Sequence, residues 1–253
     1  MTIKPPLLLL HGVTMSSAAW DTVAPLLADR YDLIVPTAAG HRGGPALAGK
    51  ATIRVLTDLT ERLLDERDLE TVHVAGNSMG GWMAVELARR GRARSVCAFS
   101  PAGLWTAGNA HNRGRDTLRR TKKLADATAY IAPTLLRFGR VRRLTMADVA
   151  VHAERLTFAQ AVHAFDDLVG CAAADDLLGT TEELQPLDPL PCPITVAWSD
   201  KDRIFPSDVF LATARQRLPQ ARFTVLPDVG HVPMVDDPEL CARTIVEAIS
   251  FGS

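Results

Sequence analysis

Ser78 stands between two glycines in the stretch VHVAGNSMGGW, which covers residues 72–82. An apolar run ends at Gly76, and helix-forming residues begin directly after the serine. This order indicates a strand, a sharp turn and a helix, with the serine hydroxyl pushed out above a sheet. Glycine suits positions 76 and 80 because a Cβ in so tight a turn would collide with neighbouring backbone. The pattern is short enough to arise by chance, so the rest of the chain must supply its context.

A serine hydroxyl is a weak nucleophile unless a base takes its proton, so a histidine is needed nearby. His231 lies in PDVGHVPMVDDP, directly after a predicted strand over 222–226. Loops that follow parallel strands are where ligand chemistry gathers in an open sheet. His73 falls inside a predicted strand instead, and His152 and His163 fall in a helical part of the chain without further metal-ligand spacing. His231 is therefore the expected general base.

The third member of such a set is a carboxylate that orients the histidine ring and stabilises its cation. The stretch VAWSDKDRIFP, residues 196–206, offers Asp200 and Asp202 just past a predicted strand. Both aspartates follow the end of the predicted strand closely, so their positions alone do not decide which of them orients the histidine. Either of them, with Ser78 and His231, would complete a set of side chains for acyl transfer.

Acyl transfer also needs N–H groups that hold the negative oxygen of the tetrahedral intermediate. The stretch LLLLHGVTMS places His11 and Gly12 just past the first predicted strand. The amide of Val13 can then face the amide of Met79 across the nucleophile. Met79 also begins the predicted helix, whose N-terminus favours negative charge. We expect these two amides to form the oxyanion hole and His11 to be structural.

Two patterns alternate along the chain: short apolar runs typical of strands buried on both faces, and longer stretches with helical spacing. Their alternation predicts an α/β protein with a mostly parallel, doubly wound sheet. We expect this core to comprise residues 1–103 and 187–253, with 104–186 as a helical lid insertion. The predicted strands are 6–10, 31–35, 71–75, 95–99, 194–198 and 222–226. The predicted helices are 17–28, 52–67, 79–90, 147–157, 159–168, 207–218 and 238–249.

The composition excludes several classes of protein. Of the 253 residues, 47% are hydrophobic and 23% are charged, close to globular averages. A net charge of -1 gives no overall attraction to nucleic acid or anionic membranes. The four cysteines show no C-x-x-C spacing, which favours free buried thiols over a metal or redox site. We find neither a signal peptide nor an apolar run approaching the roughly 20 residues of a membrane span, and so expect a cytoplasmic protein.

The predicted insertion has an uneven distribution of charge. Residues 111–143 contain ten Lys or Arg and two Asp, whereas residues 144–185 contain eight Asp or Glu and one Arg. One interpretation is that the basic segment 111–143 docks an anionic partner such as an acyl carrier. The other is that two helices of opposite charge face each other or the solvent, which has little functional meaning. The sequence leaves both open.

Taken together, these motifs resemble the α/β-hydrolase superfamily, in its serine hydrolase, carboxylesterase-like branch. The strand-HG turn, the GNSMGG elbow, the DKDRIFP loop and the GHVP stretch follow the family's order of Ser, Asp and His. In that family the acid characteristically stands four residues before a proline. Asp202 has this spacing to Pro206, so the resemblance implies Asp202 rather than Asp200. It covers nearly the whole chain, with residues 104–186 matching only as the family's variable lid.

The chain departs from the family pattern at two places. Family members often open with an antiparallel hairpin, whereas here at most one strand fits before the HG strand, so the sheet is expected to be short at that edge. The family also commonly reads D-x-x-G-x-G-x-S after the next strand. This chain has PTAAGHRGGP, in which Thr37 replaces the aspartate and His41 and Arg42 interrupt the glycines. That loop weakens any inference about substrate by analogy.

The resemblance implies hydrolysis of a small or medium carboxylic ester or lactone through an acyl-enzyme on Ser78, without a metal or organic cofactor. Serine at this position argues against the aspartate-dependent dehalogenase and epoxide-hydrolase branches. Three alternatives stay open: a carbon–carbon bond hydrolase of the meta-cleavage-product type, a cofactor-free haloperoxidase or perhydrolase, and a non-catalytic ligand-binding protein on the same fold. The apolar candidates for lid core or pocket wall are Leu104, Trp105, Phe138, Phe158 and Phe165.

Overall fold

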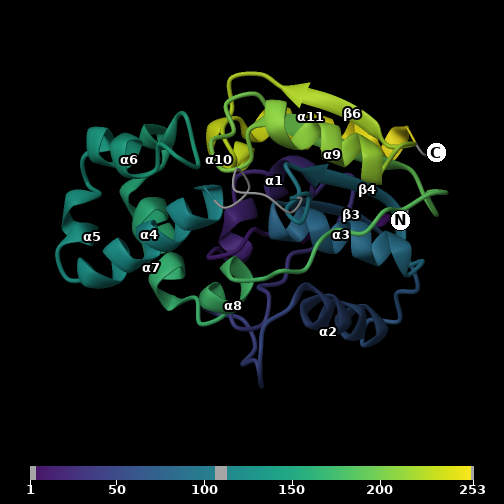
Figure 1. Ribbon diagram of the computed structural model, residues 1–253, viewed down its shortest axis with the longest axis horizontal. Helices are drawn as coiled ribbons and strands as arrows, with labels where there is room; N and C mark the ends of the chain where they lie inside the picture. The colour runs from purple at the N-terminus through teal and green to yellow at the C-terminus, as the bar shows by residue number, and fades with distance from the viewer. Residues whose placement is uncertain (1–3, 106–112, 252–253) are drawn as a thin grey trace.

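A computed structural model describes residues 4–105 and 113–251 of the chain. Within them, six parallel strands form one sheet in the order β2-β1-β3-β4-β5-β6, as Figure 1 shows in part. The expected mostly parallel, doubly wound sheet is therefore confirmed. The strands are β1 (Pro6–Leu10), β2 (Asp32–Ile34), β3 (Val72–Asn77), β4 (Ala93–Phe99), β5 (Ile194–Ser199) and β6 (Arg222–Leu226).

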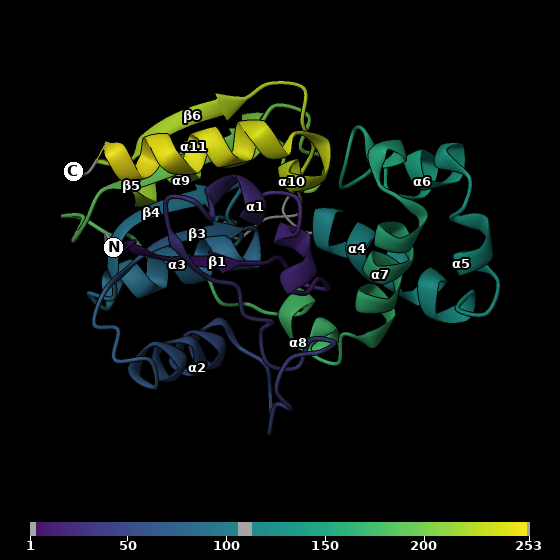
Figure 2. The same cartoon turned by 180° about the vertical axis from the view of Figure 1, so that it is seen from behind.

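Helices cover both faces of the sheet (Figures 1 and 2). In β1, Leu7 and Leu9 point to one face while Leu8 and Leu10 point to the other, as the two-residue period of a strand requires. All four are buried, because each face is packed against helices. One face carries α1 (Ala24–Leu27) and α11 (Pro238–Ser250), and the other carries α2 (Ile53–Asp65), α3 (Met79–Arg89) and α9 (Ser207–Arg217).

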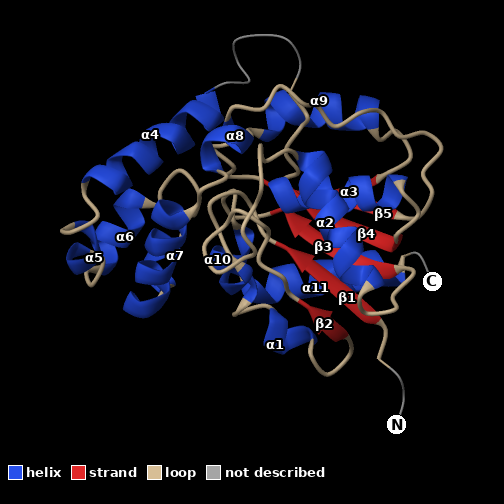
Figure 3. Ribbon diagram, turned by 90° about the horizontal axis from the view of Figure 1, so that it is seen from below, coloured by secondary structure: helices blue, strands red, loops and turns tan. Residues whose placement is uncertain are grey.

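The chain between β4 and β5 forms helices, and residues 113–178 are called the helical segment below. Figure 3 shows α4 to α7 grouped beyond the ends of the strands to which the arrowheads point. The division of the chain at residues 104 and 186 stays a prediction. The helices of this segment are α4 (Arg113–Ala127), α5 (Ala132–Leu135), α6 (Gly139–Thr145), α7 (Phe158–Gly170) and α8 (Ala174–Leu178).

The predicted helix over 147–157 is wrong. The structure has only a short 3-10 turn there, η3 (Ala153–Arg155). The N–H groups of Val151 and His152 donate to the carboxylate of Asp236, at 3.0 and 2.7 Å, instead of to carbonyls one turn earlier. Asp236 ends the short helix α10 (Pro233–Asp236), far away in sequence. A tertiary contact has overridden local helix propensity.

The predicted helix over 17–28 is interrupted. It consists of a 3-10 turn, η1 (Ser17–Trp20), followed by α1. Pro25 lies in the first turn of α1, where its missing N–H costs nothing, but it cannot continue a helix that begins at residue 17.

Three further predictions concern the sheet edge, the thiols and the membrane. Within the described residues no strand precedes β1, and β2 is an edge strand, in line with the short edge expected.

The four cysteines are free; Cys97, Cys171 and Cys241 are buried, whereas Cys192 is partly exposed. Burial raises the pKa of all four, that of Cys192 to about 11. None of the described helices is long and apolar enough to span a bilayer.

The register of the strands places four loops at one end of the sheet. Leu10 at the end of β1 pairs with Gly76 of β3, and Asn77 pairs with Phe99 of β4. On the other side, Ser199 at the end of β5 pairs with Leu226 of β6. The loops after β1, β3, β5 and β6 therefore begin side by side, although they are far apart in the sequence.

Candidate active site

Ser78 occupies a strained turn between β3 and α3. Its backbone has φ 55° and ψ -114°, a positive φ that residues other than glycine seldom adopt. A Cβ on Gly76 would lie 2.2 Å from the carbonyl oxygen of Gly80, and one on Gly80 would lie 2.3 Å from that of Leu10. Both positions therefore accept glycine alone. The turn holds Ser78 at the N-terminus of α3, whose dipole favours negative charge.

His231 and Asp202 form a buried pair next to this turn. Nδ1 of His231 lies 2.8 Å from Oδ2 of Asp202, and the two side chains are 4% and 0% exposed. Oδ1 of Asp202 accepts hydrogen bonds from the backbone N–H groups of Ile204 and Phe205, at 2.9 and 2.7 Å. Because the ionised carboxylate only accepts, Nδ1 of His231 carries the proton. The lone pair of the ring then lies on Nε2.

Nε2 of His231 is buried and has no hydrogen-bond partner among the described residues. An unpaired buried ring nitrogen costs free energy unless a ligand group or solvent forms a hydrogen bond with it. Because no protein group occupies its lone pair, this nitrogen can take a proton from a group in the cavity. The ring of Phe205 meets His231 edge to face, with 5.0 Å between centroids, and limits its movement. Ser78 and His231 both line the same cavity.

Asp200 lies apart from this pair. Its side chain is 29% exposed and makes an ion pair of 3.0 Å with the neighbouring Lys201. Of the two carboxylates that sequence spacing left open, the structure brings Asp202 to His231.

The HG turn approaches Ser78 closely. A Cβ on Gly12 would lie 3.4 Å from Cβ of Ser78, and 3.3 Å from Oδ1 of Asn77, so the loop after β1 packs directly on the elbow. The predicted oxyanion residues Val13 and Met79 directly follow Gly12 and Ser78 along the chain.

His11 fixes the orientation of one peptide unit in this turn. Its Nε2 accepts from the N–H of Ala38 at 2.9 Å, so Nδ1 donates to the carbonyl of Gly12 at 2.8 Å. That carbonyl and the N–H of Val13 belong to the same planar peptide and point in opposite directions. Burial, reinforced by the nearby His41, lowers the pKa of His11 to about 3, so the ring stays neutral. His11 thus has the structural position expected for it.

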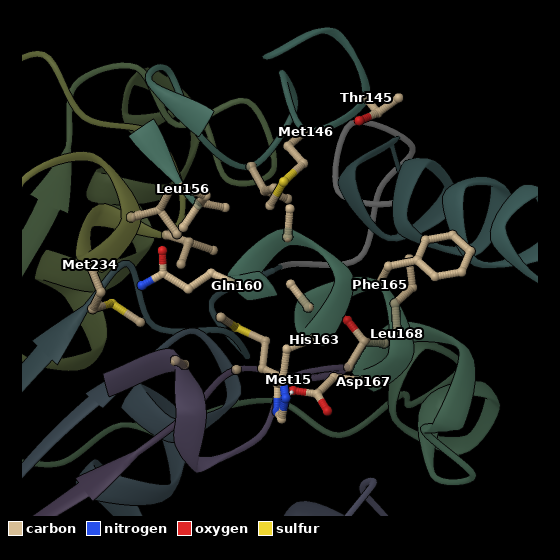
Figure 4. A pocket seen from close by; sticks show the side chains of 18 of the residues that line it. Met15, Thr145, Met146, Leu156, Gln160, His163, Phe165, Asp167, Leu168 and Met234 are labelled. Carbon is tan, nitrogen blue, oxygen red and sulfur yellow. Dashed lines mark ion pairs between the residues drawn. The ribbon is translucent and has the colours of Figure 1, made fainter. Parts of the chain in front are cut away.

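The cavity lies between the sheet end and the helical segment and has a volume of about 1110 Å³. Figure 4 labels Met15 and Met234 from the core and Met146 and Leu156 from the helical segment among the side chains that line it. Of the five apolar candidates for its wall, Phe165 lines it. Leu104 and Trp105 are buried elsewhere in the core, whereas Phe138 and Phe158 are largely exposed.

Two polar residues of this region were not predicted. Asn77 is fully buried and donates from Nδ2 to the carbonyl of His231 at 2.8 Å. Asp236 accepts from the N–H of Gly230 at 2.7 Å and so braces the loop that carries the histidine. Both stand within the stretches quoted for Ser78 and His231. A polar side chain next to an apolar run was the available signal, but their partners are set by the fold.

The basic segment 111–143 uses part of its charge internally. Residues 111 and 112 lie outside the described residues. Arg142 is buried and donates to the carbonyls of Leu136, Arg137 and Glu154, while Lys122 pairs with Asp126 at 3.0 Å. An anionic partner for this segment stays a prediction. Within residues 4–105 and 113–251, no three His, Cys, Asp or Glu side chains gather in a way that could hold a metal ion.

Comparison with known proteins agrees with this architecture. The profile of the "Alpha/beta hydrolase family" matches residues 7–244. The chain is 36% identical to epoxide hydrolase EphH of Mycobacterium tuberculosis, over 77% of this chain and 94% of that protein. It is 30% identical to a pimeloyl-(acyl-carrier protein) methyl ester esterase of Aromatoleum aromaticum, over 97% and 98% of the two chains.

Solved structures give the same fold. A thermophilic esterase from Thermogutta terrifontis superposes with a TM-score of 0.72 at 24% identity, covering 99% of this chain and 91% of that one. The family profile, the relatives and the sheet order all agree, and the chain therefore belongs to the α/β-hydrolase family and is an enzyme of the hydrolase kind on that fold.

Proposed function

We propose that this protein is a serine hydrolase that cleaves a carboxylic ester or lactone through an acyl-enzyme, with Ser78 as nucleophile, His231 as base and Asp202 as the orienting acid. The observation that carries the proposal is the buried 2.8 Å contact between His231 and Asp202. It leaves the unpaired Nε2 of His231 in a cavity that Ser78 also lines.

The reaction follows from these positions. Nε2 of His231 takes the hydroxyl proton of Ser78 while Oγ attacks the substrate carbonyl carbon. Asp202 stabilises the imidazolium that forms, and that imidazolium then gives its proton to the leaving alcohol. Water, activated by the same nitrogen, attacks the acyl-enzyme and releases the carboxylic acid. The two backbone N–H groups that donate to the Asp202 carboxylate hold it in place.

The N–H groups of Val13 and Met79 are the proposed oxyanion hole. Two observations support this assignment. His11 holds the Gly12 carbonyl, which turns the N–H of the same peptide away from His11. Met79 is the first residue of α3, so its N–H has no partner within the helix. Preorganised donors of this kind stabilise charge only where it develops during the reaction.

The substrate class rests on the cavity and on the relatives. The walls of the cavity are largely apolar, with Met15, Met146, Phe165 and Leu168 among them, which suits an acyl chain or an aryl ester (Figure 4). One relative, which matches over nearly the full length of both chains, is named as a methyl ester esterase.

The relative named as an epoxide hydrolase raises a second reaction to be tested. Attack of a serine oxygen on an epoxide carbon would leave an ether, which water does not cleave under these conditions. Attack on a carbonyl leaves an ester, which water does cleave. Serine at position 78 therefore favours the acyl substrate. Carbon–carbon bond cleavage of a vinylogous diketone would use the same acyl-enzyme and remains the runner-up.

Labelling with a fluorophosphonate probe tests the proposal. Wild-type protein should react at neutral pH, Ser78→Ala should not, and Ser17→Ala, a half-buried serine of η1, should react as the wild type does. A panel of p-nitrophenyl esters, lactones, vinylogous diketones and epoxides then defines the reaction, with turnover of the esters or lactones expected. Labelling of the Ser78→Ala protein, or no labelling of the folded wild type, would refute the assignment.

A further inference from the structure

A second group of polar side chains lies on the cavity wall, apart from Ser78 and His231. Oγ of Ser16 donates to Oδ2 of Asp167 at 2.5 Å. Nε2 of His163 lies 3.3 Å from Oγ of Ser16 and 3.4 Å from Oδ2 of Asp167. Ser16, His163 and Asp167 all line the cavity, and Figure 4 shows the His163 ring beside the Asp167 carboxylate, with Met15 alongside.

The hydrogen bonds of this group determine where the protons lie. Asp167 only accepts, and the single proton of the Ser16 hydroxyl is already directed to it. Ser16 also accepts from the N–H of Ala18 at 3.3 Å. Nε2 of His163 therefore faces two acceptors and must itself carry a proton. In the neutral ring, Nδ1 of His163 is then left with an unshared lone pair.

This lone pair is available to a ligand. Among the described residues, no hydrogen bond or ion pair to the Nδ1 atom of His163 is found. The His163 side chain is 47% exposed, although Asp167 beside it is only 4% exposed. The ring is thus held at Nε2, and the His163 side chain lines the cavity, whose other walls are mostly apolar.

Arg42 holds Asp167, the residue whose carboxylate contacts the His163 ring. Its guanidinium lies 3.0 Å from Oδ1 of Asp167 and 3.7 Å from Asp166. The aliphatic part of Arg42 lies across Gly170 at the end of α7, where a Cβ would come within 2.9 Å of it. Arg42 belongs to PTAAGHRGGP, the loop that departs from the family pattern. That departure therefore anchors α7, which carries both His163 and Asp167, to the core.

Asp167 does not need His163 to be satisfied. The Ser16 hydroxyl and the Arg42 guanidinium already supply a donor to each of its oxygens, at 2.5 and 3.0 Å. The contacts of His163 are longer than either. A purely structural role thus explains Ser16, Asp167 and Arg42, but it leaves unexplained a histidine placed on the wall of an apolar cavity.

We propose that His163, oriented by Ser16 and Asp167, is a specificity-determining residue whose Nδ1 accepts a hydrogen bond from a hydroxyl group on the acyl part of the substrate. This inference rests on the proposed ester hydrolysis and narrows its substrate class to hydroxylated esters. A substrate hydroxyl that enters this largely apolar cavity can donate a hydrogen bond to Nδ1 of His163. A group of similar size that has no proton to donate gains no such hydrogen bond.

Three matched series of p-nitrophenyl esters test this inference. Their acyl chains run from four to ten carbons and carry hydrogen, hydroxyl or methoxy at the terminal carbon. Methoxy keeps the oxygen but cannot donate. At one chain length or more, the hydroxyl ester should exceed the methoxy ester in kcat/KM by about two- to tenfold, the usual worth of one hydrogen bond. Equal values at every length would overturn the proposal without any variant being made.

Two variants assign the preference to a residue. His163→Phe keeps an aromatic ring but removes both nitrogens, and should abolish the hydroxyl preference, measured as the kcat/KM of the hydroxyl ester relative to that of the methoxy ester. His152→Phe changes a histidine of the helical segment that does not line the cavity, and should keep the preference. If His163→Phe lowers kcat/KM for all three series equally, His163 has a structural role and the inference is wrong.

Measurements of ester binding test this inference independently of the proposed function. Affinities of the three series for the Ser78→Ala protein, measured by calorimetry, do not depend on turnover. Tighter binding of the hydroxyl ester, lost when His163→Phe is added, would support the site even if no ester were hydrolysed. Hydrolysis of the unsubstituted esters without any hydroxyl preference would uphold the proposed function and refute the site.

Discussion

The side chain of Asn77 donates a hydrogen bond of 2.8 Å from Nδ2 to the main-chain carbonyl of His231. Asn77 directly precedes Ser78 and is fully buried. Its Nδ2 also lies 3.4 Å from the carbonyl oxygen of Phe99. The residue next to the proposed nucleophile therefore fixes the backbone of the proposed base. Through this contact, β3 sets the distance between two groups that are 153 positions apart in the chain.

Replacing Asn77 by aspartate should disturb this distance. The new carboxylate would place negative oxygens against two carbonyls and push the His231 loop away. We expect kcat for an activated ester to fall by up to about 10²-fold, since small displacements of reacting groups have effects of this size. KM should change little. Steady-state kinetics check this, with the melting temperature as a control for folding, and an unchanged kcat in the folded variant would show that the contact does not position His231.

The two aspartates of the DKD sequence should behave differently. Asp202→Asn removes the acceptor of the Nδ1 proton and favours the wrong ring tautomer, so kcat should fall by about 10⁴. Asp200→Asn, two residues away, loses only an exposed ion pair with Lys201 and should keep nearly full activity. Asp200→Asn is therefore the control for Asp202→Asn. Equal losses in both variants would contradict the assignment of Asp202.

The glycine at position 80 should be intolerant of any side chain. A Cβ there would lie 2.3 Å from the carbonyl oxygen of Leu10 and 2.7 Å from that of His11, so β1 or α3 would have to move. We expect Gly80→Ala to lower the free energy of unfolding by at least about 3 kcal/mol, the upper end of single-substitution effects.

Gly139→Ala is the matched control for Gly80→Ala. A Cβ on Gly139 meets nothing closer than 3.5 Å and the backbone there has no positive φ. Urea unfolding of this variant should lie within about 1 kcal/mol of wild type. Comparable destabilisation of both variants would contradict the assignment of the effect at position 80 to its contact with β1.

His11 should make the fold sensitive to acid. Its pKa is lowered to about 3 in the folded protein, first by burial and then by His41, whereas the unfolded chain takes up the proton near pH 6.5. Between these values the unfolded state binds more protons. The free energy of unfolding therefore falls as the pH falls, by up to roughly 1.4 kcal/mol per pH unit from this residue.

The non-titrating variant His11→Asn isolates this contribution. It should be less stable at pH 7, because the contacts with Gly12 and Ala38 are disturbed, yet lose less stability between pH 6.5 and pH 4. The free energy of unfolding of this variant should still depend on pH, because burial also lowers the pKa of His41 and His73. Chemical unfolding at several pH values measures both slopes, and identical slopes would show that His11 does not titrate differently on unfolding.

Local sequence patterns were enough to predict the sheet and the stretches that lie at its end. Apolar runs of five residues predict the strands, and β1 (Pro6–Leu10) and β6 (Arg222–Leu226) begin and end where the runs predict. Glycine spacing around Ser78 predicted the turn, because the backbone alone requires it. These features depend on residues within one turn or one strand of each other, and such local signals can be read from a linear pattern.

The tertiary structure alone decided which distant groups meet. Strand spacing left Asp200 and Asp202 equal and the family resemblance favoured Asp202, but their surroundings differ only in the folded protein. The helix predicted over 147–157 failed because its N–H groups bind Asp236. The contact of Ser16 with Asp167 joins residues 151 positions apart. The first depends on the adjacent loops after β5 and β6, and the other two depend on the packing of the helical segment against the core. No local periodicity carries this information.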